Sequence, residues 1–163
     1  MSIVLDTLGD LWQGRRSPLA ADLDLAELAL ASKEPIDRIA GSAIILISQS
    51  GRVPLERICG GLSELCLLAS ETPAKFHFLL TSTIVMIPDE MVLRDRILKR
   101  FIYRAIFSES TSSRCNAILL LDRLAKKGDQ TSMELLHIAR KDEDSDVSTN
   151  ATTSLRELDN LVS

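Results

Sequence analysis

The chain matches itself when it is shifted by 34 residues, and the matched positions extend over a segment long enough for two helices. Two unrelated amphipathic helices would also match apolar with apolar residues, but a repeated Asn-Ala pair and a shared acid favour a true repeat. A period of this size is typical of stacked helical pairs, in which each pair buries its apolar face against the next. The matching pairs are Ile102 and Leu136, Ala105 and Ala139, Glu109 and Glu143, Asn116 and Asn150, Ala117 and Ala151, Leu121 and Leu155, and Leu124 and Leu158.

Prolines and the scarcity of strand patterns predict an all-α chain. Only residues 44–47 and 84–87 are rich in β-branched side chains, and each segment lies inside a longer one that has helical start signals. Four prolines precede apolar runs at intervals of 19, 19 and 15 residues, and proline is favoured at the first position of a helix. These prolines are Pro35, Pro54, Pro73 and Pro88.

Capping residues mark the remaining helices and bring the expected number to about nine. We expect a first helix from Ser2 to about Trp12, a break at residues 14–18, and a second helix from Asp22 or Asp24 to about Ser32. The last three helices are expected to begin near Ser110 or Ser112, near Thr131 and near Ser145, with Gly128 as the C′ residue of the first of them.

The inner and the last helices differ in how much of their surface is apolar. Residues 76–87 are apolar around most of a helix circumference, as expected where neighbours pack on both sides. The last helix is apolar only at Val147, Ala151, Leu155 and Leu158. This single stripe fits a helix at the end of a stack.

The turn before the last helix, and the helix itself, resemble the second-helix signature of HEAT repeats. In that family a turn aspartate is followed five residues later by valine, usually then a basic residue, and then by alanine and leucine on the inner face. The residues that match this signature are Asp142, Val147, Ala151 and Leu155. Ser148 stands where the family prefers arginine or lysine, whereas the preceding unit keeps the basic residue at Arg114 and has Ser108 in place of the aspartate.

The resemblance is best over residues 95–160, and the chain upstream fits only as helical hairpins. It implies a HEAT-like α-solenoid, a right-handed stack of antiparallel helical hairpins that forms one helical-repeat domain over residues 1–163. The usual work of this family is to bind other macromolecules through an extended surface.

The sequence contains no pattern of catalytic or metal-binding residues. His77 and His137 are the only histidines, and neither has a carboxylate or cysteine three or four residues later to complete a metal-binding pair. We expect both to fill grooves between helices. Gly60 and Gly61 lie inside a helical pattern, where they favour a close helix approach or a kink over a phosphate-binding loop. We therefore expect no cofactor or metal, and the sequence favours a non-enzymatic protein while leaving an enzyme open.

The cysteines and the hydropathy pattern favour a cytoplasmic location. Cys59, Cys66 and Cys115 form neither a Cys-x-x-C pair nor an even set, so a disulfide framework is not implied. Cys59 and Cys66 share one helix face and are expected to be buried. The longest fully apolar run, residues 43–47, is far too short to span a membrane, and the N-terminus lacks the basic region of a secretion signal.

Two local charge clusters stand out in a chain with 19 basic and 23 acidic residues. Arg96, Arg100 and Arg104 recur every four residues and form one basic stripe on a helix, with Lys99 beside them. This stripe is either a solvated or paired face or a site for an acidic partner or a phosphate-bearing ligand. The second cluster is an acidic face of Asp142, Glu143, Asp144 and Asp146, which either complements a helix dipole or recognises a basic partner.

We expect a non-enzymatic protein–protein interaction module whose partner is another protein. Its acidic charge and small size fit an inhibitor or immunity-type protein that neutralises a basic partner such as a nuclease toxin. The alternative is a nucleic-acid-binding HEAT-like protein of the DNA glycosylase type, in which the basic stripe would grip phosphates. The net charge of −4 and the single Trp12 and Tyr103 argue against that alternative and against a membrane binder. Apolar inner helices also fit a homo-oligomer.

Overall fold

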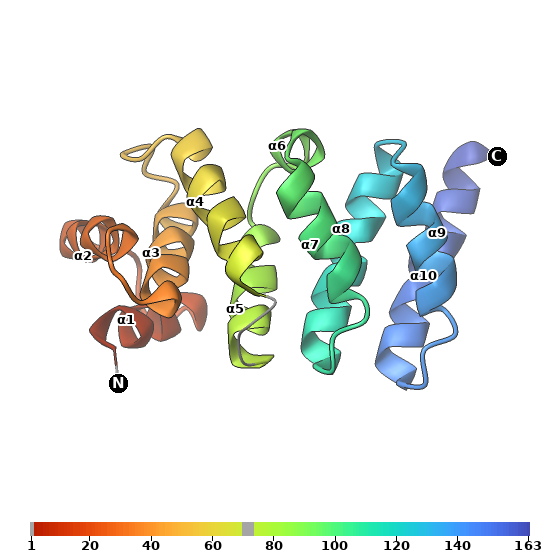
Figure 1. The fold of residues 1–163 in the computed structure, drawn as a ribbon, viewed down its shortest axis with the longest axis horizontal. Coiled ribbons are helices and arrows are strands. Elements are labelled where there is room, and N and C mark those ends of the chain that lie inside the picture. The colour runs from red at the N-terminus through yellow and green to blue at the C-terminus, as the bar shows by residue number, and fades with distance from the viewer. Residues whose placement is uncertain (1, 70–73) are drawn as a thin grey trace. The chain divides into compact units, whose positions relative to one another are not determined.

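The computed structural model of the chain describes residues 2–69 and 74–163 (Figure 1). Within these residues it has ten α-helices and no strand, which confirms the all-α prediction. Pro73, predicted as the first residue of a helix, lies outside the described residues. The chain divides into two compact units, Met1–Thr72 and Pro73–Ser163. The expectation of one domain over residues 1–163 stays a prediction.

The first unit contains four helices, with α3 packed against each of the others. These helices are α1 (Ile3–Trp12), α2 (Ala20–Leu30), α3 (Pro35–Ser48) and α4 (Leu55–Leu68). A Cβ added at Gly41 of α3 would lie 2.7 Å from the carbonyl oxygen of Ala26 and 2.9 Å from the Cβ of Ala29. Gly41 therefore allows α2 and α3 to approach closely.

The sequence predicted a close helix approach or a kink at Gly60 and Gly61. A Cβ added at either position would meet no described atom within 4 Å, so neither glycine is needed for packing among the residues described. The approach falls at Gly41 because Ala26 and Ala29, three residues apart on α2, offer a surface of small side chains to it.

The second unit contains the remaining six helices, and Figure 1 shows them following one another in chain order. They are α5 (Ala74–Ile84), α6 (Asp89–Arg94), α7 (Arg96–Ala105), α8 (Thr111–Lys126), α9 (Gln130–Ala139) and α10 (Ser145–Val162). Helix α8 packs against α5, α7, α9 and α10, and α9 also packs against α10. The core of this unit therefore lies around α8.

Proline and capping residues begin several helices where the sequence predicts them. Pro35 is the first residue of α3, whereas Pro54 and Pro88 stand one residue before α4 and α6, with extended ψ angles of 139° and 140°. Proline fits this position because its carbonyl still accepts the first helical hydrogen bonds. The Ser110 hydroxyl caps α8 by accepting from the Ser113 amide at 3.3 Å, and Gly128 follows α8 with φ +92°.

Asp95 divides the segment after Pro88 into two helices, which is why the described residues have ten helices and not about nine. The backbone of Asp95 is extended, with φ −93° and ψ 107°. Its carboxylate accepts hydrogen bonds from the amides of Ile97 at 2.9 Å and Leu98 at 3.0 Å. Asp95 therefore caps α7, and Arg96 becomes the first residue of that helix.

The helices of the second unit keep the period of 34 residues. The bounds of α7 shifted by 34 are the bounds of α9, and the capping residues Asp95 and Asp129 are also 34 apart. Buried positions correspond as well, at Leu98 and Ser132, Ile102 and Leu136, Ala105 and Ala139, Ser113 and Val147, Ala117 and Ala151, Leu121 and Leu155, and Leu124 and Leu158. The buried residues of α10 are the four that the sequence predicts.

Candidate functional site

The basic stripe lies along the exposed face of α7. Arg96, Arg100 and Arg104 are all exposed, and none of their side chains forms an ion pair or hydrogen bond with a residue that the structure describes. The opposite face of α7 carries the buried residues Leu98, Phe101, Ile102 and Ala105. Because the apolar face of α7 is packed in the core, the three guanidinium groups on the other face point to solvent along about two helical turns.

Lys99, predicted with the stripe, lies in a different setting. Its ammonium nitrogen is 3.8 Å from a carboxylate oxygen of Asp129, and its side chain is only 26% exposed. Asp129 caps α9 by accepting from the Ser132 amide at 3.0 Å, and it also accepts from the Tyr103 hydroxyl at 2.7 Å. Burial and this hydrogen bond raise the pKa of Tyr103 to about 12. Lys99 therefore belongs to a network that joins α7 to α9.

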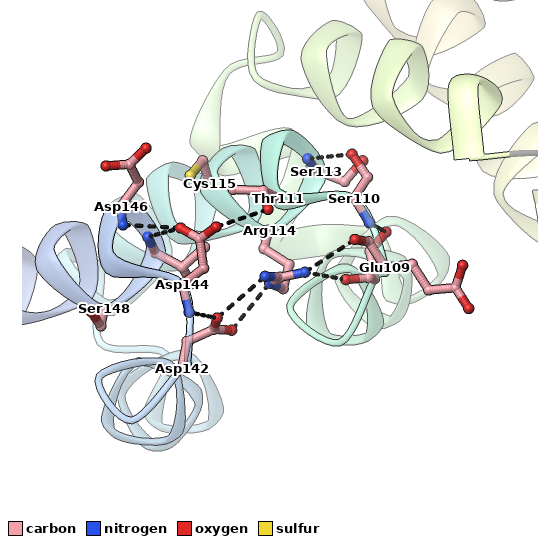
Figure 2. A network of polar contacts seen from close by, with 12 residues as sticks. Glu109, Ser110, Thr111, Ser113, Arg114, Cys115, Asp142, Asp144, Asp146 and Ser148 are labelled. Atoms are coloured by element: carbon pink, nitrogen blue, oxygen red, sulfur yellow. Dashed lines mark hydrogen bonds and ion pairs between the residues drawn. The ribbon is translucent and has the colours of Figure 1, made fainter.

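Part of the acidic face joins two helical hairpins, α7 with α8 and α9 with α10, as Figure 2 shows. The guanidinium of Arg114, on α8, binds both carboxylate oxygens of Asp142, with Nε–Oδ2 at 3.1 Å and Nη2–Oδ1 at 3.2 Å. Arg114 also donates to the carbonyl oxygen of Ser108 at 2.8 Å. The two side chains are 12% and 15% exposed. Asp142 is therefore held by the preceding hairpin and has little surface left for a partner.

Asp144 is likewise engaged within the fold (Figure 2). It caps α10 by accepting from the amides of Asp146 at 2.9 Å and Val147 at 3.3 Å, and it accepts from the Thr111 hydroxyl at 3.1 Å. The hydrogen bond from Val147 lowers the pKa of Asp144, although loss of hydration acts in the opposite direction. Glu143 and Asp146 are exposed and remain available.

Two asparagines that the repeat aligns make corresponding contacts. Asn116 on α8 donates to the hydroxyls of Ser82 at 2.8 Å and Thr81 at 3.2 Å, both on α5. Asn150 on α10 contacts the sulfur of Cys115 on α8 at 3.7 Å. Each asparagine thus joins its helix to a helix about one period earlier in the chain.

A surface pocket at the ends of α7 and α9 was not singled out from the sequence. It has a volume of about 390 Å³ and is lined by residues that include Phe107, His137, Ile138 and Lys141. Phe107 and Ile138 are 65% and 51% exposed, which is high for side chains of their size. The only sequence signal is the position of Phe107, three residues after Arg104.

The histidines and cysteines differ in their burial and surroundings. The His77 ring packs 5.9 Å from the ring of Phe101, whereas His137 is exposed at the surface pocket. Cys59 and Cys66 are buried, as predicted, and Cys115 is half-buried. Among the residues described, no group of three or more His, Cys, Asp or Glu side chains could hold a metal ion.

Comparison of the chain with protein-family models, curated proteins and solved structures found no match. No helix in the described parts of the chain combines the length and the apolar character needed to cross a membrane. A function for the chain has to come from the contacts, burial and charges of its own residues.

Proposed function

We propose that the chain is a non-enzymatic protein–protein interaction module that binds an acidic segment of another protein through the basic stripe. The observation that carries this proposal is the exposure of Arg96, Arg100 and Arg104 on one face of α7 without an acidic partner in the described structure. Three guanidinium groups at successive turns stand about 6 Å apart along the helix axis. Their summed field attracts an acidic partner and orients its approach.

Two basic residues of α8 contrast with the stripe. Arg123 binds the Asp89 carboxylate and donates to the Ile87 carbonyl at 2.7 Å, and Lys126 binds Asp122 at 2.7 Å and Glu157 at 3.1 Å. Acids or backbone carbonyl groups of the described residues thus bind both cations. The basic stripe lacks such contacts with the described residues, although the chain has more acids than bases.

The proposal includes a HEAT-like architecture, for which the ion pair between hairpins is the main support. The two hairpins each depart from the family signature, with Ser108 in place of the turn aspartate in one and Ser148 in place of the basic residue in the other. Arg114 of the first hairpin and Asp142 of the second bind each other. Two incomplete units thus supply one complete pair, as expected of repeats that stack in register.

The inhibitor and nucleic-acid versions of the function have less support. An inhibitor of a basic partner would rely on Glu143 and Asp146, since Asp142 and Asp144 are engaged within the fold. A nucleic-acid binder would use the same three arginines to hold phosphates, and the net charge of −4 opposes it. Binding of nucleic acid is therefore one of the possible results of the pull-down described next.

The test is a pull-down from native extract that compares the wild type with a triple variant, Arg96→Glu, Arg100→Glu and Arg104→Glu. The matched control reverses three other exposed cations, Lys33, Arg57 and Arg156, and so changes the net charge equally. Bound proteins are identified by mass spectrometry, and bound nucleic acid by its sensitivity to nuclease. Circular dichroism checks that each variant is folded.

We expect a discrete protein that the wild type and the control variant retain and the stripe variant loses, with binding that weakens as salt is raised. If the stripe variant and the control variant retained this protein equally well, the basic stripe would not be its binding site. Nuclease-sensitive material held by the wild type alone would replace the proposal with the nucleic-acid alternative.

A further inference from the structure

The basic stripe leads directly to the surface pocket. Phe107 follows Arg104 by three residues, and its amide donates to the carbonyl oxygen of Arg104 at 3.0 Å. The intervening Ile106 keeps helical angles, with φ −64° and ψ −19°. The helical turn therefore continues past the end of α7 and places Phe107 on the face that carries Arg100 and Arg104.

The pocket beside Phe107 combines apolar walls with a basic rim. Phe107 and Ile138 leave large parts of their side chains open to solvent, and the exposed Lys141 lines the same pocket. Asp142 also lines it, but Arg114 binds both of its carboxylate oxygens. The uncompensated charge around the pocket is therefore positive, like that of the basic stripe.

We infer that the stripe and the pocket form one docking surface for an acidic segment with a large apolar anchor residue. The inference rests on the proposed function and specifies the partner's chemistry. The partner's acids face Arg96, Arg100 and Arg104, and its anchor, an aromatic or long aliphatic side chain, fills the pocket between Phe107 and Ile138. Aromatic side chains that fill pockets, and arginines, are the residues most often found at binding hot spots.

Charge complementarity favours a partner of this kind over a second copy of the chain. In a two-fold symmetric dimer through this surface, the same patch would meet itself. The arginines of the two stripes would then approach each other, which is unfavourable at close range. An acidic segment neutralises these charges and covers the exposed apolar side chains at the same time.

The experiment measures binding of fluorescent helix-forming peptides to the full chain. The control peptide has three glutamates spaced four residues apart. Two anchored peptides add a tryptophan three residues before the first glutamate or after the last, which covers both directions of docking. Each peptide is titrated with the wild type, with Phe107→Ala, with Ile138→Ala and with Leu119→Ala. Leu119 is a comparably exposed side chain on α8 and is the matched control.

We expect one anchored peptide to bind the wild type at least about tenfold more tightly than the control peptide. Phe107→Ala and Ile138→Ala should remove this advantage without changing the affinity of the control peptide, and Leu119→Ala should change neither. The triple Arg→Glu stripe variant should weaken binding of all three peptides.

If the anchored and control peptides bound the wild type equally well, the inference would be overturned. The proposed function would still stand if the stripe variant then bound neither kind of peptide. Absence of binding by all three peptides would also overturn it, and the proposed function would then depend on the pull-down. Two further results would overturn the inference. The first is tighter binding of a duplex oligonucleotide than of the anchored peptides. The second is a dimer of the chain, detected by analytical ultracentrifugation, that the substitution Phe107→Ala dissociates.

Discussion

The basic stripe on α7 and the acidic face before α10 are both short clusters of like charge, yet the fold uses them differently. Asp142 and Asp144 of the acidic face bind Arg114, backbone amides and a hydroxyl. The stripe arginines bind no residue that the structure describes. Asp144 caps a helix whose free backbone amides need acceptors, and Asp142 faces the guanidinium of a neighbouring helix, whereas the arginine side chains project from the outer face of α7. Contact with helix-end amides or with a neighbouring helix thus separates the charges that hold the fold from the charges free to bind.

The sharpest test of this difference removes one arginine from each group. We expect Arg114→Ala to lower the free energy of unfolding by about 2–3 kcal/mol, because it leaves the mostly buried Asp142 carboxylate without its partner. Arg104→Ala should change the free energy by less than about 0.5 kcal/mol. Urea denaturation measures both values. If Arg104→Ala destabilised the protein as much as Arg114→Ala does, the stripe would also be structural.

A second, smaller effect is expected at the capping acid of α10. Replacing Asp144 with asparagine should lower the melting temperature at pH 7, and Glu143→Gln, a change at an exposed neighbour, should not. Because folding lowers the pKa of Asp144 below the ordinary value of an aspartate, its contribution to stability is complete above that ordinary value. It disappears as the pH falls through the lower folded-state value.

Melting curves of the wild type and Asp144→Asn should therefore converge in strong acid. The check is a series of calorimetric scans from neutral pH to about pH 2. A difference that stayed constant across this range would mean that the carboxylate charge is not what stabilises α10.

The smallest expected effect concerns the stripe itself. Arg96, Arg100 and Arg104 repel one another at four-residue spacing, and a like-charge pair of this kind costs about 0.2–0.5 kcal/mol. Replacing all three with glutamine should raise the free energy of unfolding slightly at low salt, and the gain should fade at high salt. Denaturation at two salt concentrations tests this. A loss of stability on replacement would show that the arginines have partners in the folded protein.

Local patterns predicted those parts of the molecule that depend on neighbouring residues. Ser110, Gly128 and the four apolar residues of α10 lie where capping preferences and helical spacing put them. The exposed stripe follows from the same spacing, because the apolar residues of α7 decide which face is inward. The sequence pattern leaves the role of Asp95 ambiguous, because an aspartate between basic residues can either pair with them inside one helix or cap a new helix.

Contacts between distant residues were outside the reach of these patterns. Arg114 and Asp142 are 28 residues apart, and their pairing depends on how two hairpins pack. The surface pocket needs the end of α7 to lie beside the end of α9, and the role of Gly41 needs α2 to lie against α3. Lys99 shared a sequence cluster with the stripe but lies close to Asp129 of the next hairpin. In each case the deciding partner lies in another part of the chain.

The pairing of Arg114 with Asp142 also restricts how the two hairpins can diverge. Each hairpin contains only one member of the pair, so a substitution at position 114 changes which residue is favourable at position 142, and the reverse is also true. Loss of the arginine leaves a carboxylate with too few donors, and loss of the aspartate leaves a guanidinium with too few acceptors. Positions 114 and 142 are therefore expected to covary among related sequences, and Arg96, Arg100 and Arg104 to vary independently of residue 142.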